Sequence, residues 1–435
     1  MQILLTIFGF PCAMLDIRLI RHQPDLVKAR LATRGSRMED AIDAVLATDS
    51  RRRALETRLQ GLQAERNRLS KQIGTLRSKG QDTASTEAEV RSYAAEMQAL
   101  SEQGALLEQE QRNLLLILPN LPEENVPTGN DPSENLVIRT WGDRPVSGVG
   151  EDHISIARRL KLVDFERAAR MTGSGFVCFE GKGARLERAL VNFLLDLHTE
   201  EHGYTEVSPP FLTKPEALVG TSNLPKFEEQ LYCIERDALY LAPTAEVPVT
   251  NLHREESVEL SKLPLKYVAY TACFRREAGA AGVGTRGLIR MHQFDKVELV
   301  KICTPESSSA ELEALTADAE RVLQMLGLHY RVIELCTGDL SFGAAKTYDI
   351  EVWSPGQDSF LEVSSCSNFG DFQARRMNLR FKGEDGKNRF CHTLNGSGTA
   401  LPRLYVALLE TGLRKDGTVA LPEPLHSYFG ATAID

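Results

Sequence analysis

Two stripes of regularly spaced apolar residues, separated by a short polar break, limit the fold of this chain more than any other feature. In the first stripe, residues 55–76, the apolar positions follow one another at intervals of 4, 3, 7, 4 and 3, and Arg66 takes the missing position. In the second, residues 90–114, intervals of 3 and 4 alternate. This spacing is typical of coiled-coil helices. Because the break spans only residues 78–82, the two helices must run antiparallel. The sequence therefore predicts a slender arm, with about 40 to 50 Å per helix at about 1.5 Å per residue.

The two predicted helices differ in charge. Residues 51–79 hold nine basic and two acidic side chains, whereas residues 81–114 hold seven acidic and two basic ones. Since the whole chain has a formal net charge of -9, a nucleic-acid contact needs a local basic surface. The first helix supplies one that suits an RNA phosphate backbone. The alternative is a solvated face whose charges pair across the two helices. The candidate RNA-binding residues are Arg51, Arg58, Arg66, Arg68, Lys71 and Arg77.

Length and composition predict a soluble globular protein of two or three domains. The chain has 435 residues, 42% of them hydrophobic and 26% charged, and no segment predicts a membrane span. Eight cysteines without a CxxC pair disfavour a zinc ribbon and fit reduced thiols in the cytoplasm. Residues 1–13 are apolar, with no preceding Lys or Arg and no A-x-A cleavage pattern. We therefore expect an unstructured extension there rather than a signal peptide.

The rest of the chain divides at a segment rich in Pro, Asn, Asp and Gly. We expect residues 14–118 to form the helical arm domain, residues 119–145 to act as a linker, and residues 146–435 to form the body. In the body, residues 184–202 have the apolar spacing of an amphipathic helix, and later strands alternate with glycine turns and polar loops. These patterns predict an α+β fold with an antiparallel β-sheet flanked by helices.

The most informative part of the body is a glycine-rich hairpin at residues 271–300. Arg275, Glu277, Arg286 and Arg290 surround the turn, and a strand that alternates polar and apolar residues follows, with Phe294 near its start. Arginines can hold phosphate oxygens through forked hydrogen bonds, and an aromatic ring can lie flat on a base. The hairpin therefore predicts a nucleotide site. The alternative is an exposed hairpin held by salt bridges.

The order of residues in this hairpin closely resembles the second signature motif of class II aminoacyl-tRNA synthetases, and the run EAG...TRGLIRMHQFDKVE resembles the seryl-tRNA synthetase version. Residues 202–212 resemble the first motif, residues 392–410 the third, and residues 244–253 and 361–376 two further seryl-enzyme segments. The turn departs from the family at Val283 and Gly284.

The resemblance implies what the chain does and how it is assembled. It makes residues 146–435 a class II catalytic domain that activates L-serine with ATP and Mg²⁺ and transfers it to serine tRNA. The arm would reach the long variable arm of that tRNA and read its shape and backbone. The helix and strand at residues 184–212 would form the interface of a cytoplasmic homodimer. Whether selenocysteine tRNA is a second substrate stays open.

The resemblance also implies the site residues. Arg275 and Arg403 would contact the α- and γ-phosphates, and together with Glu277, which would receive the adenine amino group, they form the predicted catalytic set. Serine needs an acidic partner for its ammonium group and hydrogen bonds for its hydroxyl. The predicted serine-binding residues are Thr244, Ala245, Glu246, Arg275, Glu298 and Ser397. The predicted ATP-binding residues are Arg275, Arg276, Glu277, Met291, Phe294, Glu362, Val363, Ser364, Ser365 and Arg403.

Glu362 and Ser365 are the predicted Mg²⁺ ligands, because Mg²⁺ takes few carboxylates and keeps phosphate oxygens around it. Some of the site residues have a plainer alternative: Phe294 as a core residue, Arg403 as a surface residue, and Ser397 as a turn residue. Two rival functions are open as well. An adenylate-forming ligase that loads serine onto a non-tRNA acceptor would not need the basic arm. A catalytically inactive coiled-coil binding protein would have lost the catalytic set.

Overall fold

The computed structural model describes residues 14–35, 38–145, 151–278 and 287–435, and these form two compact units. The smaller unit comprises Met1–Ala32 and Ser36–Pro119, and the larger one comprises Thr33–Gly35 and Asn120–Asp435. Among the described residues, no helix is long and apolar enough to cross a membrane.

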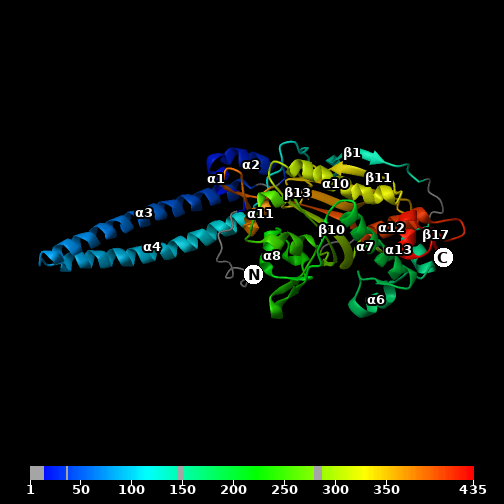
Figure 1. Cartoon of the computed structure of the whole chain (residues 1–435), viewed down its shortest axis with the longest axis horizontal. Coiled ribbons are helices and arrows are strands. Elements are labelled where there is room, and N and C mark those ends of the chain that lie inside the picture. The colour runs from blue at the N-terminus through cyan, green and yellow to red at the C-terminus, as the bar shows by residue number, and fades with distance from the viewer. Residues whose placement is uncertain (1–13, 36–37, 146–150, 279–286) are drawn as a thin grey trace. The chain divides into compact units, whose positions relative to one another are not determined.

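The smaller unit is a helical arm. Its four helices are α1 (Ile17–His22), α2 (Pro24–Ala32), α3 (Glu39–Ser78) and α4 (Ala84–Leu116). Figure 1 shows α3 and α4 side by side along the arm. The predicted seam is confirmed, because every seventh residue from Leu55 to Leu69 on α3 is buried, as are Leu107 and Gln111 on α4. At the end of the seam, Leu115 is buried, whereas the predicted Leu114 is only half-buried. Arg66 is half-buried at the polar position of the seam.

The predicted length of the first helix is wrong. α3 has 40 residues and α4 has 33, which correspond to about 60 and 50 Å at about 1.5 Å per residue. The extra turns of α3 lie before the heptad stripe, where α1 and α2 pack on α3 in addition to α4. Ile42 and Val45 are fully buried there, and Arg21 binds Asp49 through two nitrogen–oxygen contacts of 2.9 and 3.0 Å.

The larger unit is built on an eight-stranded sheet with the order β1-β11-β12-β13-β16-β10-β9-β4. Every neighbouring pair is antiparallel except β4 and β9. The strands are β1 (Leu136–Trp141), β4 (Thr205–Glu206), β9 (Leu265–Phe274), β10 (Gln293–Cys303), β11 (Tyr330–Glu334), β12 (Lys346–Ser354), β13 (Ser359–Asn368) and β16 (His392–Ala400). The predicted antiparallel sheet with flanking helices is confirmed.

The segment predicted as a linker contributes to this sheet, so the prediction that residues 119–145 only connect two domains needs correction. Within it, β1 pairs with β11 from Leu136 opposite Glu334 to Trp141 opposite Tyr330. Most of the residues of β1 are exposed, because it is an edge strand. Its Pro, Asn and Asp-rich flanks resemble a loop, and the partner strand lies almost 200 positions away in the chain.

Three helices pack on the sheet: α7 (Lys182–Glu200), α10 (Ser308–Met325) and α12 (Leu401–Gly412). The apolar stripe predicted for residues 184–202 is the buried face of α7, with Leu186, Leu190 and Phe193 in the main core. Val297 and Leu299 of β10 belong to the same core. Since side chains alternate between the faces of a strand, the residues between them face the other side of the sheet, where the candidate site lies.

Smaller elements complete the larger unit. Its short helices are α5 (His153–Arg159), α6 (Phe165–Thr172), α8 (Pro215–Gly220), α9 (Glu246–Thr250), α11 (Phe372–Met377) and α13 (His426–Phe429). Its short strands are β2 (Val163–Asp164), β3 (Cys178–Phe179), β5 (Leu212–Thr213), β6 (Cys233–Ile234), β7 (Leu239–Leu241), β8 (Ser257–Val258), β14 (Arg380–Lys382), β15 (Asn388–Phe390), β17 (Val419–Ala420) and β18 (Ala433–Ile434). Of these, α9 and α11 help to enclose the site.

Candidate active site

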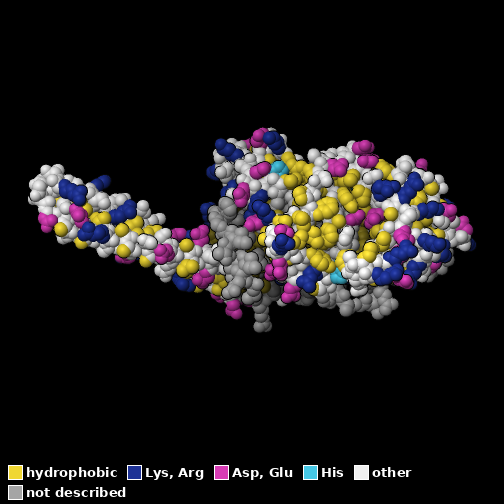
Figure 2. Space-filling model, turned by 90° about the horizontal axis from the view of Figure 1, so that it is seen from below, with side chains coloured by type: hydrophobic (Ala, Val, Ile, Leu, Met, Phe, Trp, Pro, Cys, Tyr) yellow, Lys and Arg dark blue, Asp and Glu magenta, His cyan; other side chains and the backbone are white. Residues whose placement is uncertain are grey.

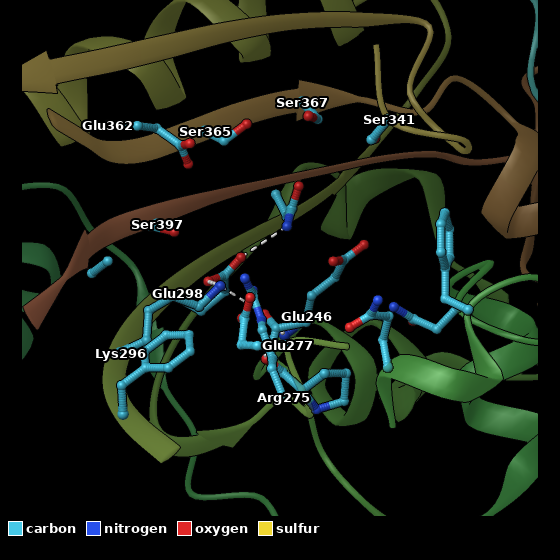
Figure 3. Close-up of a pocket in the computed structure, with 18 of the residues that line it drawn as sticks. Glu246, Arg275, Glu277, Lys296, Glu298, Ser341, Glu362, Ser365, Ser367 and Ser397 are labelled. Carbon is cyan, nitrogen blue, oxygen red and sulfur yellow. Dashed lines mark hydrogen bonds and ion pairs between the residues drawn. The ribbon is translucent and has the colours of Figure 1, made fainter. Parts of the chain in front are cut away.

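A cavity of about 590 Å³ opens on the sheet face away from the α7 core. β10 lines it with Phe294, Lys296 and Glu298, which occupy every second position. Strand pairing brings in residues that are distant in the sequence, because Glu298 lies opposite Ser397 of β16. Figure 3 shows the lining side chains that come from β10, β13 and β16 around this space.

One side of the cavity is suited to phosphates and a base. Arg275 follows β9, and its Nε donates to the Pro243 carbonyl at 3.2 Å. Its guanidinium carbon lies 5.1 Å from the centre of the Phe294 ring. Arg403, in the first turn of α12, donates from Nη1 to the Glu362 carbonyl oxygen at 2.7 Å. Two arginines and a partly buried aromatic ring thus line one space, as the sequence predicts.

The hairpin turn has features of both predicted alternatives, a nucleotide site and an exposed hairpin held by salt bridges. Glu277 lines the cavity in the left-handed backbone region, at φ 48°, and its carboxylate accepts from Arg290 Nη1 at 2.7 Å. A salt bridge of the exposed hairpin is therefore present next to the cavity. Val283 and Gly284, where the turn departs from the family pattern, lie outside the described residues, as does Arg286.

The other side of the cavity is a buried network of acids and amides. The Glu298 side chain is fully buried, and its Oε1 accepts from Asn395 Nδ2 at 2.8 Å. Lys296 forms an ion pair with Glu298 Oε2 and donates to Thr244 Oγ1 at 2.8 Å. Glu246 accepts from Gln373 Nε2 at 2.7 Å. This side can bind a small group that carries a positive charge and a hydroxyl.

Burial changes the acidity of this network. The pKa of Glu246 is raised to about 7, first because burial disfavours the charged carboxylate and second because Glu298 lies nearby. The hydrogen bond from Gln373 opposes the shift. A cation that enters this side of the cavity therefore meets one carboxylate that is already ion-paired and another that exchanges a proton near neutral pH.

The predicted magnesium ligands lie on β13, and Figure 3 shows Glu362 and Ser365 along the same strand. Both line the cavity. The described residues contain no group of three His, Cys, Asp or Glu arranged to hold a metal, so protein donors alone do not form a complete metal site. One carboxylate and one hydroxyl fit Mg²⁺ that takes its remaining ligands from phosphates and water.

Asp349 is an acid near this site that the sequence did not single out. It faces Ser365 across the β12–β13 pairing, and burial, with the neighbouring Glu362 charge, raises its pKa well above the usual range. Its position in the run TYD gives no local signal of a site. Only the pairing of two strands brings it beside the predicted metal ligands.

Most of the predicted substrate-binding residues line the cavity, and three do not. Arg276 is exposed, and its backbone N–H donates to the Gln230 carbonyl at 2.9 Å. Ala245 is buried beside the lining residue Thr244. The Ser364 hydroxyl is buried and donates to the Ser397 carbonyl at 2.6 Å, so it positions a lining residue. The remaining twelve line it: Thr244, Glu246, Arg275, Glu277, Met291, Phe294, Glu298, Glu362, Val363, Ser365, Ser397 and Arg403.

Lys296, Asn395 and Gln373 are site residues that received no predicted role. Lys296 and Asn395 could have been found from strand periodicity, since each lies two positions from a predicted serine-binding residue and so shares its face. Gln373 is buried on α11, and no pattern in the sequence connects it with Glu246.

The candidate RNA-binding residues lie on the arm, and none of them lines this cavity. Arg58 pairs with Glu96 at 2.8 Å and Arg77 with Glu87 at 2.9 Å, both across the two long helices. The predicted pairing across the arm is thus confirmed in part. Figure 2 shows basic and acidic side chains interspersed on the arm surface. Exposed pairs of this kind are worth only about 0 to 1 kcal/mol, so a phosphate can replace the carboxylate at little cost.

Comparison with known proteins identifies the two parts of the chain. Residues 14–122 match the family model "Seryl-tRNA synthetase N-terminal domain", and residues 227–412 match the "tRNA synthetase class II core domain (G, H, P, S and T)". The chain is 57% identical to the serine–tRNA ligase of Akkermansia muciniphila, over 97% of this chain and 99% of that protein.

Solved structures agree with this result. Seryl-tRNA synthetase from Pyrococcus horikoshii, determined with ATP, superposes with a TM-score of 0.92 at 37% identity, over 97% of this chain and 99% of the other. The cytoplasmic serine–tRNA ligase of Naegleria fowleri, determined with AMP, gives 0.87 at 27% identity, over 98% and 99%. Because the identity to a serine–tRNA ligase is 57% over nearly the whole chain and both family models match, the chain belongs to the seryl-tRNA synthetase family.

Proposed function

We propose that the chain activates L-serine with ATP to form seryl-adenylate and then transfers serine to the 3'-terminal ribose of serine tRNA. One observation carries this proposal: the two arginines suited to phosphate and the buried Glu298 suited to an ammonium group line the same cavity. An amino acid held at Glu298 and a nucleotide held at Arg275 can therefore meet. Oriented reactants of this kind supply much of the rate acceleration of an enzyme.

In the first step, a serine carboxylate oxygen attacks the α-phosphorus of ATP, and pyrophosphate leaves. No protein group forms a covalent bond. Arg275 would bind the serine carboxylate and the α-phosphate, and so neutralise the charge that develops between them. Arg403 would bind the γ-phosphate and hold the leaving group in line. Phe294 would cover one face of the adenine ring, and Glu277 would accept from its amino group.

Glu362 and Ser365 would hold Mg²⁺, which neutralises phosphate charge when it is bound. In the second step the terminal ribose hydroxyl attacks the seryl carbonyl, and AMP leaves. Thr244, Glu246, Glu298 and Ser397 would hold the serine ammonium and hydroxyl groups through both steps.

The arm would bring the tRNA to the site. Residues 14–118 would form the tRNA-binding domain and residues 146–435 the catalytic domain, with a connecting segment between them. Arg51, Arg58, Arg66, Arg68, Lys71 and Arg77 would contact the backbone of the long variable arm. The excess of basic residues on α3 supports this role, since basic side chains bind phosphates. Six or more phosphate contacts would also make binding depend strongly on salt.

We further propose that the chain works as a cytoplasmic homodimer. β4 is the last strand at its edge of the sheet and pairs only with β9 among the described strands. An edge strand offers unpaired backbone groups to a partner. Figure 2 also shows hydrophobic side chains gathered on one face of the larger unit. A subunit interface would cover such surfaces.

The function is tested by measuring serine-dependent exchange of pyrophosphate into ATP, followed by aminoacylation of serine tRNA with and without its long variable arm. We expect exchange with serine alone and charging only of the tRNA that has its variable arm. Exchange without any tRNA charging would favour a ligase with a non-tRNA acceptor. The absence of exchange would favour an inactive binding protein. Selenocysteine tRNA, added to the same assay, shows whether it is a second substrate.

A further inference from the structure

Lys296 is a buried cation in the serine side of the cavity, and the steps described above give it no role. Its side chain is only 7% exposed. It lies on β10 between Phe294 and Glu298, forms an ion pair with Glu298 Oε2, and donates to Thr244 Oγ1 at 2.8 Å. In Figure 3 it lies beside Glu298, within the group of side chains around the cavity.

When Glu246 and Glu298 are both ionised, the charges around Lys296 balance only after an ammonium group enters. The charged groups that face it are Glu298 on the same strand, Glu246 from α9 and Arg275 after β9. If Arg275 is matched by the carboxylate of serine or by a phosphate, Lys296 leaves the two carboxylates with one net negative charge. One substrate ammonium cancels it. The neutral groups nearby are Cys273, Gln373, Asn395 and Ser397.

Glu298 keeps room for that ammonium. Its Oε1 accepts from Asn395 at 2.8 Å. Apart from the ion pair with Lys296, its Oε2 has no hydrogen-bond donor among the described residues. An ionised carboxylate has about four lone-pair positions, so acceptor capacity is left toward the cavity. A protonated carboxyl would instead present an O–H, which repels an ammonium group.

We propose that Lys296 is a positioning residue that holds the Glu298 carboxylate through their ion pair and aims the Thr244 hydroxyl, so that the pocket selects an amino acid by its ammonium group. This inference rests on the proposed function. Without Lys296, the two buried carboxylates would bind a proton more tightly, because like charges in a buried site disfavour double ionisation and the cation that opposes this effect would be gone. Lys296 acts through Glu298 and Thr244 rather than on the reacting atoms.

The test compares Lys296→Met with Lys301→Met in pyrophosphate exchange. Lys301 is a matched control, because it is a fully buried lysine of the same strand that pairs with a carboxylate, Glu311 at 2.9 Å, and does not line the cavity. KM for serine, KM for ATP and kcat are measured from about pH 6 to about pH 9. This range spans the pKa region in which a buried carboxyl would titrate.

For Lys296→Met we expect KM for serine to rise about 30-fold, and KM for ATP to change by less than about threefold, since the lost charge pair faces only the serine side. The acid limb of kcat/KM for serine should move to higher pH by about one unit, because the remaining carboxylates bind a proton more tightly. Lys296→Arg, which keeps the charge, should restore the original pH profile even if its kcat is low.

Three results would overturn the proposal: a serine KM for Lys296→Met within threefold of the starting protein, a rise in KM with an unchanged pH profile, or the same behaviour in Lys301→Met. If Lys296→Met does not fold, the Arg variant decides, and a shifted acid limb in that variant would count against the proposal. Failure of the proposed function itself would be recognised separately, since the unaltered chain would then show no exchange with serine at any pH.

Discussion

The raised pKa of Glu246 makes a quantitative prediction about stability. The side chain is buried, and its pKa moves from 4.5 to about 7 in the folded chain. A carboxyl group with a raised folded pKa stabilises the fold fully below its unfolded pKa, and that contribution is lost as the pH rises toward the folded value. At about 1.36 kcal/mol per pKa unit, the difference corresponds to about 3 kcal/mol of unfolding free energy, which is lost between about pH 4.5 and about pH 7.

Glu246→Gln should remove this loss. The amide oxygen can still accept from Gln373, whose own orientation is fixed because its Oε1 accepts from Thr393 Oγ1 at 2.8 Å. We therefore expect equal unfolding free energies for variant and starting protein near pH 4.5. Near pH 8 the variant should be more stable by about 3 kcal/mol. The variant should also bind serine more weakly at pH 8, where the starting protein offers a second carboxylate to the ammonium group.

The measurement is urea unfolding in the absence of serine, followed by tryptophan fluorescence at several pH values. The two tryptophans, Trp141 and Trp353, lie on β1 and β12, so the signal reports the larger unit. If the unfolding free energies of the two proteins changed with pH in parallel, the reasoning would be refuted. So would a variant that is less stable at pH 8, since it would show that the ionised carboxylate is stabilising.

Four further perturbations test the phosphate-binding arginine, the arm and the support of the site. Arg275→Ala should abolish pyrophosphate exchange, measured with saturating serine and ATP, and detectable exchange at more than about 1% would contradict its assigned role. Removal of residues 51–110 should leave exchange intact and eliminate charging of serine tRNA, and Lys71→Gln alone should make the KM for tRNA less dependent on salt. Arg34→Ala should destabilise the larger unit by about 2 to 4 kcal/mol in urea unfolding. An unchanged midpoint would show that its hydrogen bonds contribute nothing.

Local patterns were sufficient for the elements that repeat or alternate. The heptad stripe fixes the seam of the arm from Leu55 to Leu69, and the period of α7 fixes its buried face, because both signals come from neighbours within two turns. The hairpin from Thr271 to Val300 was also found from its own residues. In each case the side chains that face the core follow directly from the spacing.

Contacts between distant segments could not be found in this way. β1 is exposed and becomes a strand only by pairing with β11. The first turns of α3 are held by α1 and α2, which lie outside the heptad pattern. The register between β10 and β16 places Ser397 opposite Glu298, and only that register adds Asn395 to the serine side of the cavity. A pocket built from cross-strand neighbours is a property of the sheet rather than of any one motif.

The position of Arg34 decides how the arm can be removed in a meaningful experiment. Its guanidinium donates to the carbonyls of Asn120, Leu340, Ser341 and Ala344 at distances from 2.6 to 3.1 Å. Residues 341–343 line the cavity, so this early segment supports the site although it precedes the long helices. A truncation that begins the chain after residue 35 would remove the guanidinium that these four carbonyls share and would damage activation for structural reasons. An internal deletion of residues 51–110 keeps Arg34, and a loss of charging without a loss of exchange can then be attributed to the arm itself.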